Sequence, residues 1–418
     1  MNILFLSTEN PYPPDHGHHL RTYYVLRHLA EENRVFFVSF SQSQEDMKYK
    51  MHLESFCTSV DIFAIPGRVQ KLRFGFAAAC NLFSSWPFSV QRYYHRAAAH
   101  RIREILKTER IDIVHFDMIH LAPYLAVVGN TPTVAVNHNV ESLRLLRLAG
   151  VQKHSWKRFL LLLQYQKMRN FEQQMCGKFQ RLIAVSETDA ELFEMECQLQ
   201  KVAVIPNGVD TDFFKPSRNS VVPDSLVWVG GMTSPYNRDA VEYFLDEIFP
   251  KIYLAQPQIK VSFVGNAPTA KLREYQNRYP RNIEITGYVA DVRPFIMRAS
   301  IFVAPIRCGS GTKIKILNAM AMGKAVVTTT LGVEGIKAKP GRDIIVTDTP
   351  EEFADSILYL LAHPEIATKM GRNARTLIEQ FYDWRVIYEQ IDKLYGELPH
   401  NASLVQEAKQ ACAKPLVV

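Results

Sequence analysis

Short apolar runs alternate with amphipathic stretches twice along this chain, on either side of a single break rich in Pro, Gly and Asp. The chain opens with an apolar run at Ile3–Leu6, a helical pattern at Leu20–Ala30 and a β-branched run at Val35–Phe40. Strand, helix and strand at these distances favour a parallel βαβ unit. The break, PNGVDTDFFKP at 206–216, has the composition of an interdomain linker and predicts a hinge.

The alternation continues through both halves, so that each half is expected to form its own sheet. We predict an α/β fold of two Rossmann-like, doubly wound parallel-sheet domains, with an interdomain cleft at the carboxyl ends of the strands, where such folds bind ligands. The expected parts are 1–205, 206–375, a helix at 376–398 that crosses back, and a tail at 399–418. Further strands are expected at 111–116, 133–137, 181–185, 202–205, 226–229, 260–264, 283–286, 301–304, 325–329 and 344–346.

The composition is that of a folded protein. The 418 residues include 49 Lys+Arg against 42 Asp+Glu, and no apolar run approaches the ~20 residues that span a bilayer. The first residues, MNILFLSTENPYPP, lack the pattern of a signal peptide, and the six cysteines are scattered without a CxxC pair. We therefore expect a cytoplasmic protein with reduced thiols.

The excess of positive charge is concentrated between Arg68 and Arg110. Nine basic residues occur there against two acidic ones, with Phe, Trp and Tyr interleaved. Such a surface suits anionic lipid, a polyanion or a phosphorylated substrate, and a peripheral contact with the inner face of the membrane is one expectation. The alternative is a pair of solvated helices whose aromatic side chains belong to the core. No nucleic-acid-binding module accompanies the charge, so no nucleic acid is expected as a partner.

The segment CGSGTKIKILNAMAMGKAVVTT at 308–329 places a glycine-rich loop where an expected strand gives way to a helix. Such a junction exposes backbone N–H groups and the positive end of the helix dipole, and it favours a phosphate or diphosphate. Lys313 and Lys315 stand in the expected first turn, where a cation is unfavourable for the helix, and a bound anion explains them better than helix stability does. A plain N-cap with exposed lysines is the alternative. The loop residues are Gly309, Ser310, Gly311 and Thr312.

A second glycine-bearing junction, PYPPDHGHHLR, follows the first expected strand. Gly17 would let the backbone approach a phosphate or sugar closely, and Arg21 is a candidate phosphate contact, with a solvated helix-face arginine as the alternative. The neighbouring His16, His18 and His19 could suggest a metal ion. Adjacent histidines rarely converge on one ion without a partner carboxylate, so no metal site is expected.

The third segment, VNHNVES at 136–142, directly follows the apolar run at 133–136. His138 at the carboxyl end of a strand could donate to a sugar hydroxyl or act as a base, and Asn137 and Asn139 add hydrogen-bonding groups. The alternative is a capping cluster for the following helix, with Asn139 as the N-cap. We favour the functional interpretation of His138.

Together these segments resemble a known family. VIPNGVDTDFFKP, IAVSETDAELF and the block ITGYVADVRPFIMRASIFVAPIRCGSGTKIKILNAMAMGKAVVTTTLGVEGI are similar to glycosyltransferase family 4, whose members are retaining transferases of the GT-B fold. The opening segment and HNVES resemble the branch with bacterial sugar transferases of exopolysaccharide and exosortase-associated systems. The order and spacing of these segments cover about residues 1–395.

The resemblance implies an N-terminal acceptor-side domain and a C-terminal domain that binds a nucleotide-diphosphate sugar. His138 would be the catalytic residue, contacting the transferred sugar, while the loop at 309–315 would meet the diphosphate and Gly287–Val289 would border the base, in a loop shaped by Asp291. No cofactor or metal is implied beyond the nucleotide sugar as co-substrate. The expected substrate-binding residues are Gly17, Arg21, Asn139, Gly231, Asn237, Arg238, Gly287, Val289, Gly309, Ser310, Gly311, Thr312, Lys313, Lys315 and Asn318.

The chain departs from the family pattern at three places. Two glutamates that many members carry eight residues apart are replaced by Ser310 and Asn318. The usual Gly-Gly after the first strand is Gly17-His18. The segment GMTSPYN at 231–237 has no match to the usual Arg and Lys, which leaves Arg238, Lys313 and Lys315 as substitutes.

The expected function is that of a retaining, metal-independent hexosyltransferase that moves a sugar from a nucleotide-diphosphate donor to a glycan or lipid-linked acceptor in polysaccharide biosynthesis. A catalytically weak paralogue, acting as a sugar-nucleotide sensor or partner subunit, is the alternative that the missing glutamates favour. A sugar-nucleotide 2-epimerase would share the fold but would need cleft carboxylates that the sequence does not reveal.

Overall fold

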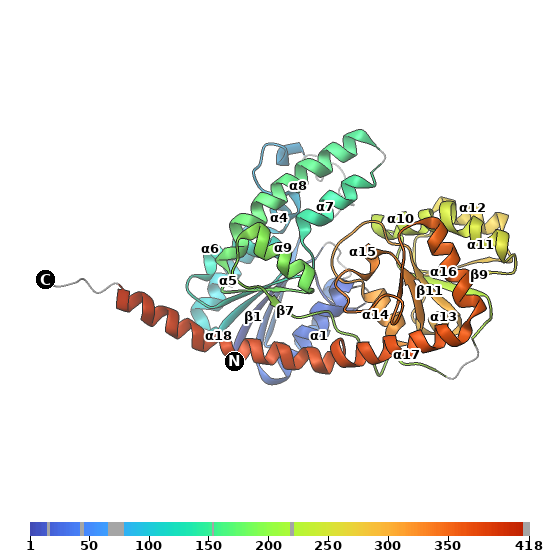
Figure 1. Cartoon of the computed structure of the whole chain (residues 1–418). Helices are drawn as coiled ribbons and strands as arrows, with labels where there is room; N and C mark the ends of the chain where they lie inside the picture. The colour runs from blue at the N-terminus through green and yellow to red at the C-terminus, as the bar shows by residue number, and fades with distance from the viewer. Residues whose placement is uncertain (15–16, 42–45, 66–78, 153, 218–220, 413–418) are drawn as a thin grey trace. The chain divides into compact units, whose positions relative to one another are not determined.

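The protein consists of two compact units in a computed structural model that describes residues 1–418 except 15–16, 42–45, 66–78, 153, 218–220 and 413–418 (Figure 1). The first unit comprises Met1–Ser142, Leu163–Ile205 and Tyr388–Val418. The second comprises Leu143–Leu162 and Pro206–Ile387. The chain therefore passes from the first unit to the second between Ile205 and Pro206, directly before the sequence that predicts a hinge. The expected cleft between domains stays a prediction.

The first unit is built on a seven-stranded sheet in the order β3-β2-β1-β4-β5-β6-β7, with every neighbouring pair parallel. The chain starts in the middle of the sheet and winds outward in both directions, as a doubly wound fold does. The strands are β1 (Asn2–Ser7), β2 (Arg34–Ser41), β3 (Ser59–Ala64), β4 (Ile113–Asp117), β5 (Thr133–Asn137), β6 (Arg181–Ala184) and β7 (Ala203–Val204).

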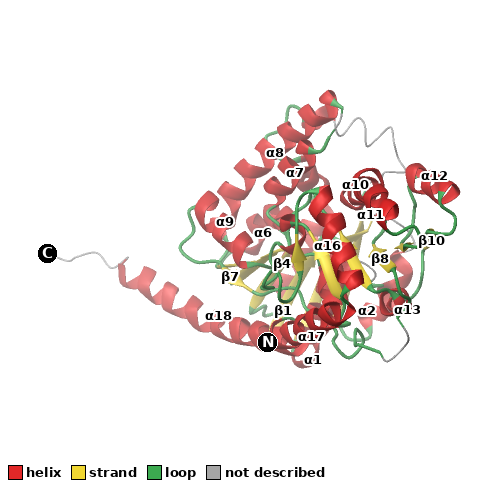
Figure 2. Cartoon of the chain, turned by 45° about the vertical axis from the view of Figure 1, so that its right-hand side comes forward, coloured by secondary structure: helices red, strands yellow, loops and turns green. Residues whose placement is uncertain are grey.

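Helices connect the strands of this sheet and cover it, as the yellow strands between red helices in Figure 2 illustrate. The helical elements are α1 (Gly17–Glu32), η1 (Asp46–Tyr49), α2 (Lys50–Glu54), α4 (Phe88–Tyr93), α5 (Arg96–Thr108), η2 (Ile119–Tyr124), α6 (Leu125–Val128), α7 (Glu141–Gly150), α8 (Ser155–Met175), η3 (Cys176–Lys178) and α9 (Glu187–Cys197). Because both faces are covered, the central strands are apolar without alternation. In β4 and β5 every residue is buried.

The second unit repeats the design with a six-stranded parallel sheet in the order β10-β9-β8-β11-β12-β13. Successive residues of β11 serve opposite faces, since Ile301 and Val303 pack into one apolar core and Phe302 and Ala304 into another. The strands are β8 (Ser225–Val229), β9 (Lys260–Val264), β10 (Ile283–Gly287), β11 (Ile301–Ala304), β12 (Ala325–Thr328) and β13 (Ile345–Val346).

One helical segment of this unit runs through three helix types. The α10 helix (Pro235–Tyr243) passes into a π-helical turn, η4 (Phe244–Ile248), and then into α11 (Phe249–Ala255). Pro250 lacks an N–H group and cannot continue the α-helical hydrogen bonds, which accounts for the wider turn before it. The other helices are α12 (Ala270–Arg278), α13 (Arg293–Arg298), α14 (Ile314–Ala321), α15 (Thr330–Val333), α16 (Pro350–Ala362), α17 (Pro364–Phe381) and α18 (Trp384–Cys412).

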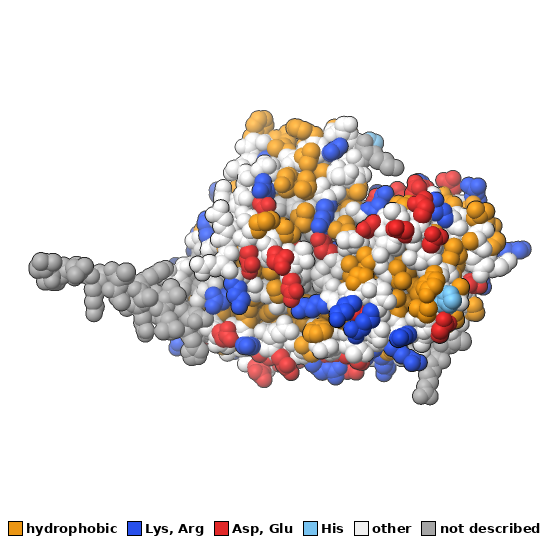
Figure 3. Space-filling model, viewed as in Figure 1, with side chains coloured by type: hydrophobic (Ala, Val, Ile, Leu, Met, Phe, Trp, Pro, Cys, Tyr) orange, Lys and Arg blue, Asp and Glu red, His pale blue; other side chains and the backbone are white. Residues whose placement is uncertain are grey.

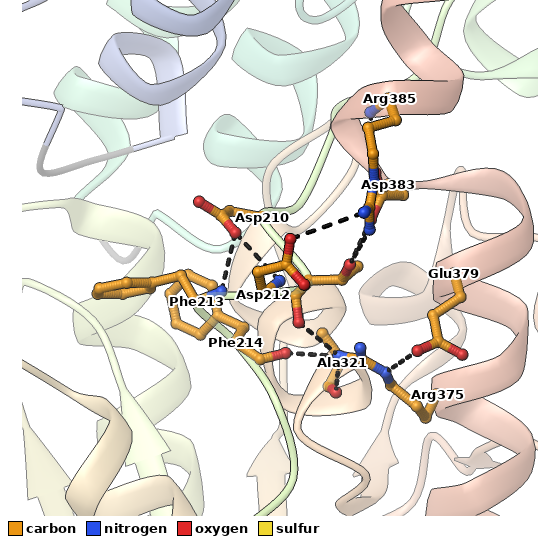
Figure 4. A network of polar contacts seen from close by, with 10 residues as sticks. Asp210, Asp212, Phe213, Phe214, Ala321, Arg375, Glu379, Asp383 and Arg385 are labelled. Carbon is orange, nitrogen blue, oxygen red and sulfur yellow. Dashed lines mark hydrogen bonds and ion pairs between the residues drawn. The ribbon is translucent and has the colours of Figure 1, made fainter.

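The segment after the crossing point is bound firmly into the second unit. The guanidinium of Arg375 donates to the carbonyl oxygens of Thr211, Phe214 and Ala321 at 3.1, 2.7 and 2.7 Å (Figure 4). Thr211 also donates to the carboxylate of Asp383, which Arg385 contacts at 2.7 Å. The predicted linker sequence is therefore part of the second unit, and the hinge stays a prediction.

Three expectations about the fold need correction. The β3 strand was not expected, because Asp61 interrupts its short apolar pattern and its position at the sheet edge leaves it partly exposed. The tail expected from 399 onward is wrong, since α18 continues as a helix to Cys412. The residues 143–162, expected in the first domain, belong to the second unit. Within the described ranges, no helix combines the length and apolarity that a bilayer span requires.

We expect Gly371→Ala to destabilise the second unit by about 1–3 kcal/mol, the usual cost of overpacking. A Cβ atom on Gly371 of α17 would lie 1.9 Å from the carbonyl oxygen of Gly323, a backbone atom that cannot move aside as a side chain does. Urea unfolding of the purified chain measures the effect. Gly396→Ala in α18 is the matched control, because nothing lies within 4 Å of its Cβ position. We expect that control to be neutral or slightly stabilising, and equal effects of both changes would contradict the packing argument.

Candidate functional site

A buried carboxylate organises the carboxyl edge of the first sheet. Asp117, the last residue of β4, accepts a hydrogen bond of 2.6 Å from the hydroxyl of Thr22 in α1. The imidazole Nε2 of His138 lies 2.7 Å from one of its carboxylate oxygens, and Nε2 of His18 lies 3.2 Å from the other. Strands β4 and β5 are neighbours, so their carboxyl ends bring Asp117 and His138 together. Sequence analysis missed Asp117, although a lone acidic residue directly after an expected strand was a usable signal.

Electrostatics make Asp117 an anion at neutral pH. Burial by itself would raise its pKa, but the charges and hydrogen bonds of His138 and His18 outweigh burial and hold the pKa well below its usual value. Burial lowers the pKa of His138, although Asp117 opposes this effect. The pKa of His18 is raised, because Asp117 and Glu9 outweigh the effect of burial.

These charge states determine how His138 can act. An ionised Asp117 can only accept, so the proton on His138 occupies Nε2, the nitrogen that faces the carboxylate. A neutral ring then presents Nδ1 as a hydrogen-bond or proton acceptor. Asp117 thus acts through His138, by orienting its ring and selecting its tautomer.

The neighbours of His138 do not behave as the capping alternative predicts. The carboxylate of Glu172 in α8 accepts from the backbone N–H groups of Glu141 and Ser142 at 2.8 and 3.3 Å, so Glu172 caps α7. Burial raises the pKa of Glu172 to about 8. The side chain of Asn139 instead donates to Glu141 at 3.2 Å, and its expected contact with a substrate stays a prediction.

The other residues expected to act at the junction of β1 and α1 differ in their surroundings. Gly17 is the first residue of α1, and its expected close approach to a phosphate or sugar stays a prediction. Arg21 is 3% exposed, and burial lowers its pKa to about 10. This burial contradicts the solvated alternative, and the expected phosphate contact of Arg21 stays a prediction. The physical reason is that residue 21 lies one turn beyond Gly17, on the face of α1 that packs against the sheet. His16 is outside the described residues.

In the second unit the ammonium group of one lysine brings side chains from three elements into contact. The Nζ atom of Lys315 in α14 donates to Oδ1 of Asn237 in α10 at 2.6 Å and lies 4.6 Å from the ring of Trp228 in β8. Asn237 in turn donates to the carbonyl oxygen of Gly231 at 2.8 Å. Gly230 has φ +157°, and a Cβ atom there would lie 2.6 Å from the ammonium group, so a side chain at this position would displace the end of Lys315.

The glycine loop approaches the same place. Gly309 and Gly311 have φ of +109° and +70°, conformations that a side chain disfavours. The Nζ atom of Lys313, the N-cap of α14, donates to the carbonyl oxygen of Gly311 at 2.5 Å. The hydroxyl of Ser310 is buried and has no hydrogen-bond partner among the residues that the structure describes.

A bound anion would neutralise the positive charge of this loop. Burial, with the nearby charge of Lys313, lowers the pKa of Lys315 to about 7, and the described part of the chain gives Lys315 no salt bridge. Two neighbouring cations at the N-terminal end of a helix favour an anion there. Lys313 and Lys315 are therefore brought together as expected, with Gly231, Asn237 and the loop at 309–311. The contacts in place show lysines engaged with polar atoms rather than exposed to solvent.

Two arginines of α7 also lie near the glycine-rich loop, and the sequence did not predict their roles. Arg147 donates to the carbonyl oxygen of Gly309 at 2.9 Å and forms a bidentate pair with Glu334, at 2.6 and 2.7 Å. Arg144 donates to the hydroxyl of Tyr236 at 2.6 Å. These arginines gave no signal in the sequence because their partners are 92 to 187 residues away.

The remaining expected residues of the second unit have other contacts. Arg238 is exposed and reaches the carbonyl oxygen of Met232 at 3.5 Å. Gly287 ends β10 with open space around its Cβ position, while Val289 packs against the core. Asp291 accepts from Arg293 at 2.7 Å, which shapes that loop as expected. Thr312 donates to the carbonyl oxygen of Gly335 at 3.5 Å, and Asn318 lies in α14, half-buried.

Three of the described residues have spacing that a metal ion could use. One ligand atom each of His18, Asp117 and His138 lies within 4.8 Å of the others. The sequence indicated no partner carboxylate for His18, and Asp117 is one. The same atoms are joined by the hydrogen bonds described above, which explain their proximity without an ion. The expectation that the protein needs no metal stays a prediction.

The chain is similar to known glycosyltransferases along most of its length. The family model "Glycosyltransferase Family 4" matches residues 17–213, and "Glycosyl transferases group 1" matches residues 223–363. An uncharacterised 44.6 kDa protein of the cps region of Klebsiella pneumoniae is 22% identical over 94% of this chain and 99% of its own. The phosphatidyl-myo-inositol mannosyltransferase of Mycobacterium tuberculosis is 26% identical over 70% of this chain and 77% of its own.

Solved structures show the same fold. Sucrose-phosphate synthase from Thermosynechococcus elongatus superimposes with a TM-score of 0.70 at 15% identity, over 95% of this chain and 99% of that one. Anabaena HepE in complex with UDP superimposes with a TM-score of 0.67 at 15% identity, over 95% and 100% of the two chains. The expected GT-B fold is confirmed.

We expect Asp117→Asn to lower the pKa of His18, because the charge and hydrogen bond that raise it are lost. Imidazole NMR titration of the purified chain measures the shift. His363, which pairs with Glu365 on the second unit, is the internal control. An unchanged titration of His18 would show that Asp117 does not control the charge of this cluster.

We expect Lys313→Ala/Lys315→Ala to weaken the binding of inorganic pyrophosphate by about 2 kcal/mol, the scale of charged hydrogen bonds. Because the pKa of Lys315 is about 7, the wild-type chain should bind more weakly as the pH rises from 7 to 9, and binding should take up a proton. Calorimetry in buffers of different ionisation enthalpy measures both effects. Lys337→Ala/Lys339→Ala removes the same charge from exposed positions of this unit, and equal losses in the two variants would refute the site.

Proposed function

We propose that this chain, which belongs to glycosyltransferase family 4, is a retaining hexosyltransferase that moves a sugar from a nucleotide-diphosphate donor to a glycan or lipid-linked acceptor. The observation that carries the proposal is the cationic glycine loop. Lys313, Lys315 and the N-terminal end of α14 form an anion site at the carboxyl edge of a parallel sheet, where Rossmann-like folds bind nucleotides.

We assign the donor to the second unit. The loop at 309–311 and the two lysines would hold the diphosphate, and Gly287–Val289 would border the base. The charge on the departing diphosphate grows in the transition state, so cations already in place there stabilise it without reorganisation. The complexes of Anabaena HepE with UDP and UDP-glucose support a uridine donor as the first to be tested.

We assign the transferred sugar to His138 in the first unit. With Nε2 held by Asp117, Nδ1 can accept a hydrogen bond from a sugar hydroxyl and orient the sugar ring. In a same-face displacement, a donor phosphate oxygen takes the proton of the attacking acceptor hydroxyl. Such a mechanism needs no metal ion to activate the acceptor, and we propose that none takes part.

We infer a lipid-linked or glycan acceptor, used at the cytoplasmic face of the membrane. The similarity to a phosphatidyl-myo-inositol mannosyltransferase and to a cps-region protein supports this class of acceptor. The basic, aromatic stretch around 68–110 supports peripheral contact with anionic lipid, although its residues 68–78 lie outside the described structure.

One alternative rests on a specific observation. Ser310 and Asn318 stand where many family members carry glutamates, and neither side chain supplies a negative charge to a nucleotide's ribose. A catalytically weak paralogue that senses sugar nucleotides or supports an active partner would explain this loss. Such a protein would bind a donor without turning it over.

We expect the purified chain to hydrolyse slowly one member of a panel of UDP-, GDP- and ADP-sugars without an acceptor, and faster with membrane extract. His138→Ala should lower turnover by about 10²-fold or more while changing donor affinity little, because its contact is to the reacting sugar. Measured turnover and calorimetric affinity separate the two effects. Equal losses would make His138 a binding residue, and binding without turnover across the panel would favour the sensor.

A further inference from the structure

Arg21 in α1 is a buried cation. Its side chain is 3% exposed, and of the arginines that the structure describes it is the one that the fold buries. Many other Lys and Arg side chains lie on the surface, where solvent and salt screen their charge (Figure 3). Removing a guanidinium group from water is costly unless an opposite charge compensates it, so the surroundings of Arg21 should contain an anion.

The carboxylate of Asp117 is that anion. Arg21, Thr22 and Asp117 line one cavity of about 10 Å³, so their side chains face the same small space inside the first unit. Thr22, the next residue of α1, donates to the carboxylate at 2.6 Å and fixes this turn of the helix against it. Burial lowers the pKa of Arg21 to about 10 and the charge of Asp117 opposes this effect, so the guanidinium is charged at neutral pH.

One face of α1 meets this carboxylate. His18, Arg21 and Thr22 follow the i, i+3, i+4 spacing that places side chains on the same side of a helix. Nε2 of His18 lies 3.2 Å from Asp117, so the helix brings an imidazole, a guanidinium and a hydroxyl towards one anion. The sequence could not indicate this arrangement, because the carboxylate lies 95 to 99 residues further along the chain.

Neutral groups complete the cavity. His115 lies two residues before Asp117 in β4, so both side chains are on the same face of the sheet. Burial lowers the pKa of His115 to about 3, which leaves its ring neutral. The hydroxyl of Tyr395 in α18 is hydrogen-bonded to Nδ1 of His115, and burial raises the pKa of Tyr395. Of the described residues that line the cavity, Asp117 and Arg21 alone are charged.

The charge of Arg21 bears on the state of His138. A carboxylate 2.7 Å from an imidazole favours its protonation, so Asp117 and His138 by themselves would gain from becoming an ion pair. With Arg21 in place the carboxylate already has a cation, and an imidazolium would add a further positive charge to a buried cluster. An imidazolium carries N–H groups on both nitrogens and could not accept from a sugar hydroxyl.

Other titratable groups face this cluster from the elements packed around it. Burial lowers the pKa of His138, Asp117 opposes this effect, and the charges of His18 and Arg21 lower the pKa further. Because the pKa of Arg21 is about 10, its charge is constant over the range in which histidines titrate. The complete set around the Asp117–His138 pair is His18, His19 and Arg21 of α1, Glu9 after β1, His115 of β4 and Tyr395 of α18.

We propose that Arg21 is a positioning residue, whose buried guanidinium balances the carboxylate of Asp117 so that His138 stays neutral with its proton on Nε2. This inference rests on the proposed function in one respect, because that function gives Nδ1 of His138 the role of acceptor towards the transferred sugar. It replaces the expected contact of Arg21 with a donor phosphate. Arg21 acts through Asp117 and touches no substrate.

Nitrogen-15 NMR of the imidazole rings tests the proposal on the full chain, because the shifts of Nδ1 and Nε2 distinguish the two neutral tautomers from the imidazolium. His138→Gln identifies the signals. At pH 7 the wild type should show His138 neutral with its proton on Nε2, and Arg21→Met should raise the pKa of His138. A wild-type His138 that is already an imidazolium at pH 7 would overturn the proposal, and this measurement needs no folded variant of Arg21.

Three further variants separate charge from packing. Arg21→Lys keeps the cation and should keep His138 neutral. Arg27→Met removes an exposed arginine of the same helix and should leave His138 unchanged. Tyr395→Phe removes a buried hydrogen bond at the same cavity without changing the charge, so it should lower stability and leave the pKa of His138 as in the wild type. Equal shifts of this pKa in Tyr395→Phe and Arg21→Met would show that Arg21 only packs the core.

Donor turnover supplies a second measurement. Because a protonated His138 cannot accept, Arg21→Met should turn over a nucleotide sugar about tenfold or more slowly than the wild type at pH 6. The two rates should approach each other at pH 9, where His138 is neutral in both, and calorimetric donor affinity should be unchanged. A loss of turnover that is the same at every pH would contradict the role of the charge.

The two proposals can fail separately. If the NMR signals of His138 respond to Arg21→Met as expected and no nucleotide sugar is turned over, the proposed function fails alone. If a nucleotide sugar is turned over and the charge state of His138 does not respond to Arg21→Met, the inference about Arg21 fails and the proposed function stands.

Discussion

Parallel strands that are covered on both faces leave the chain one place where polar side chains can gather, the carboxyl edge of each sheet. In β4 and β5 every residue is buried, so Asp117 and His138 occur at the point where the strands end. In the second unit the same constraint places the glycine loop after β11 and Gly230–Gly231 after β8. A cavity of about 500 Å³ borders Ile301 and Ala325 at the opposite edge, where none of these residues lies.

The carboxyl edges of the two sheets differ in whether a buried charge has partners that compensate it. Asp117 is surrounded by donors from α1, β1 and the connection between β5 and α7, and its charge is compensated within the first unit. Lys315 has neutral partners, an amide oxygen and an indole face, and a second cation next to it. Burying an uncompensated charge is costly, so the site is more stable when an anion supplies the missing charge. This asymmetry supports the proposal that the edge of the second sheet binds an anion while the edge of the first positions His138.

Much of the fold and part of the site could be predicted from the sequence. Strands buried on both faces appear in the sequence as continuous apolar runs. Glycines next to lysines mark the loop before α14. Both signals are local, so recognising them does not depend on distant contacts. The role of Arg21 could not be predicted, because a position one turn into α1 is buried or exposed according to how that helix packs. Asp117 and Arg147 were missed because their partners lie far along the chain.

The sequence by itself therefore determined the alternation of strands and helices, the division near 205, the family resemblance and the composition of the glycine loop. These properties are local, set by the spacing of side chains along a few turns or strands. Only the tertiary structure decided which nitrogen of His138 carries the proton and that Lys315 lies against Trp228. Each depends on which side chains the fold brings within a few ångströms, and spacing along the chain does not contain that information.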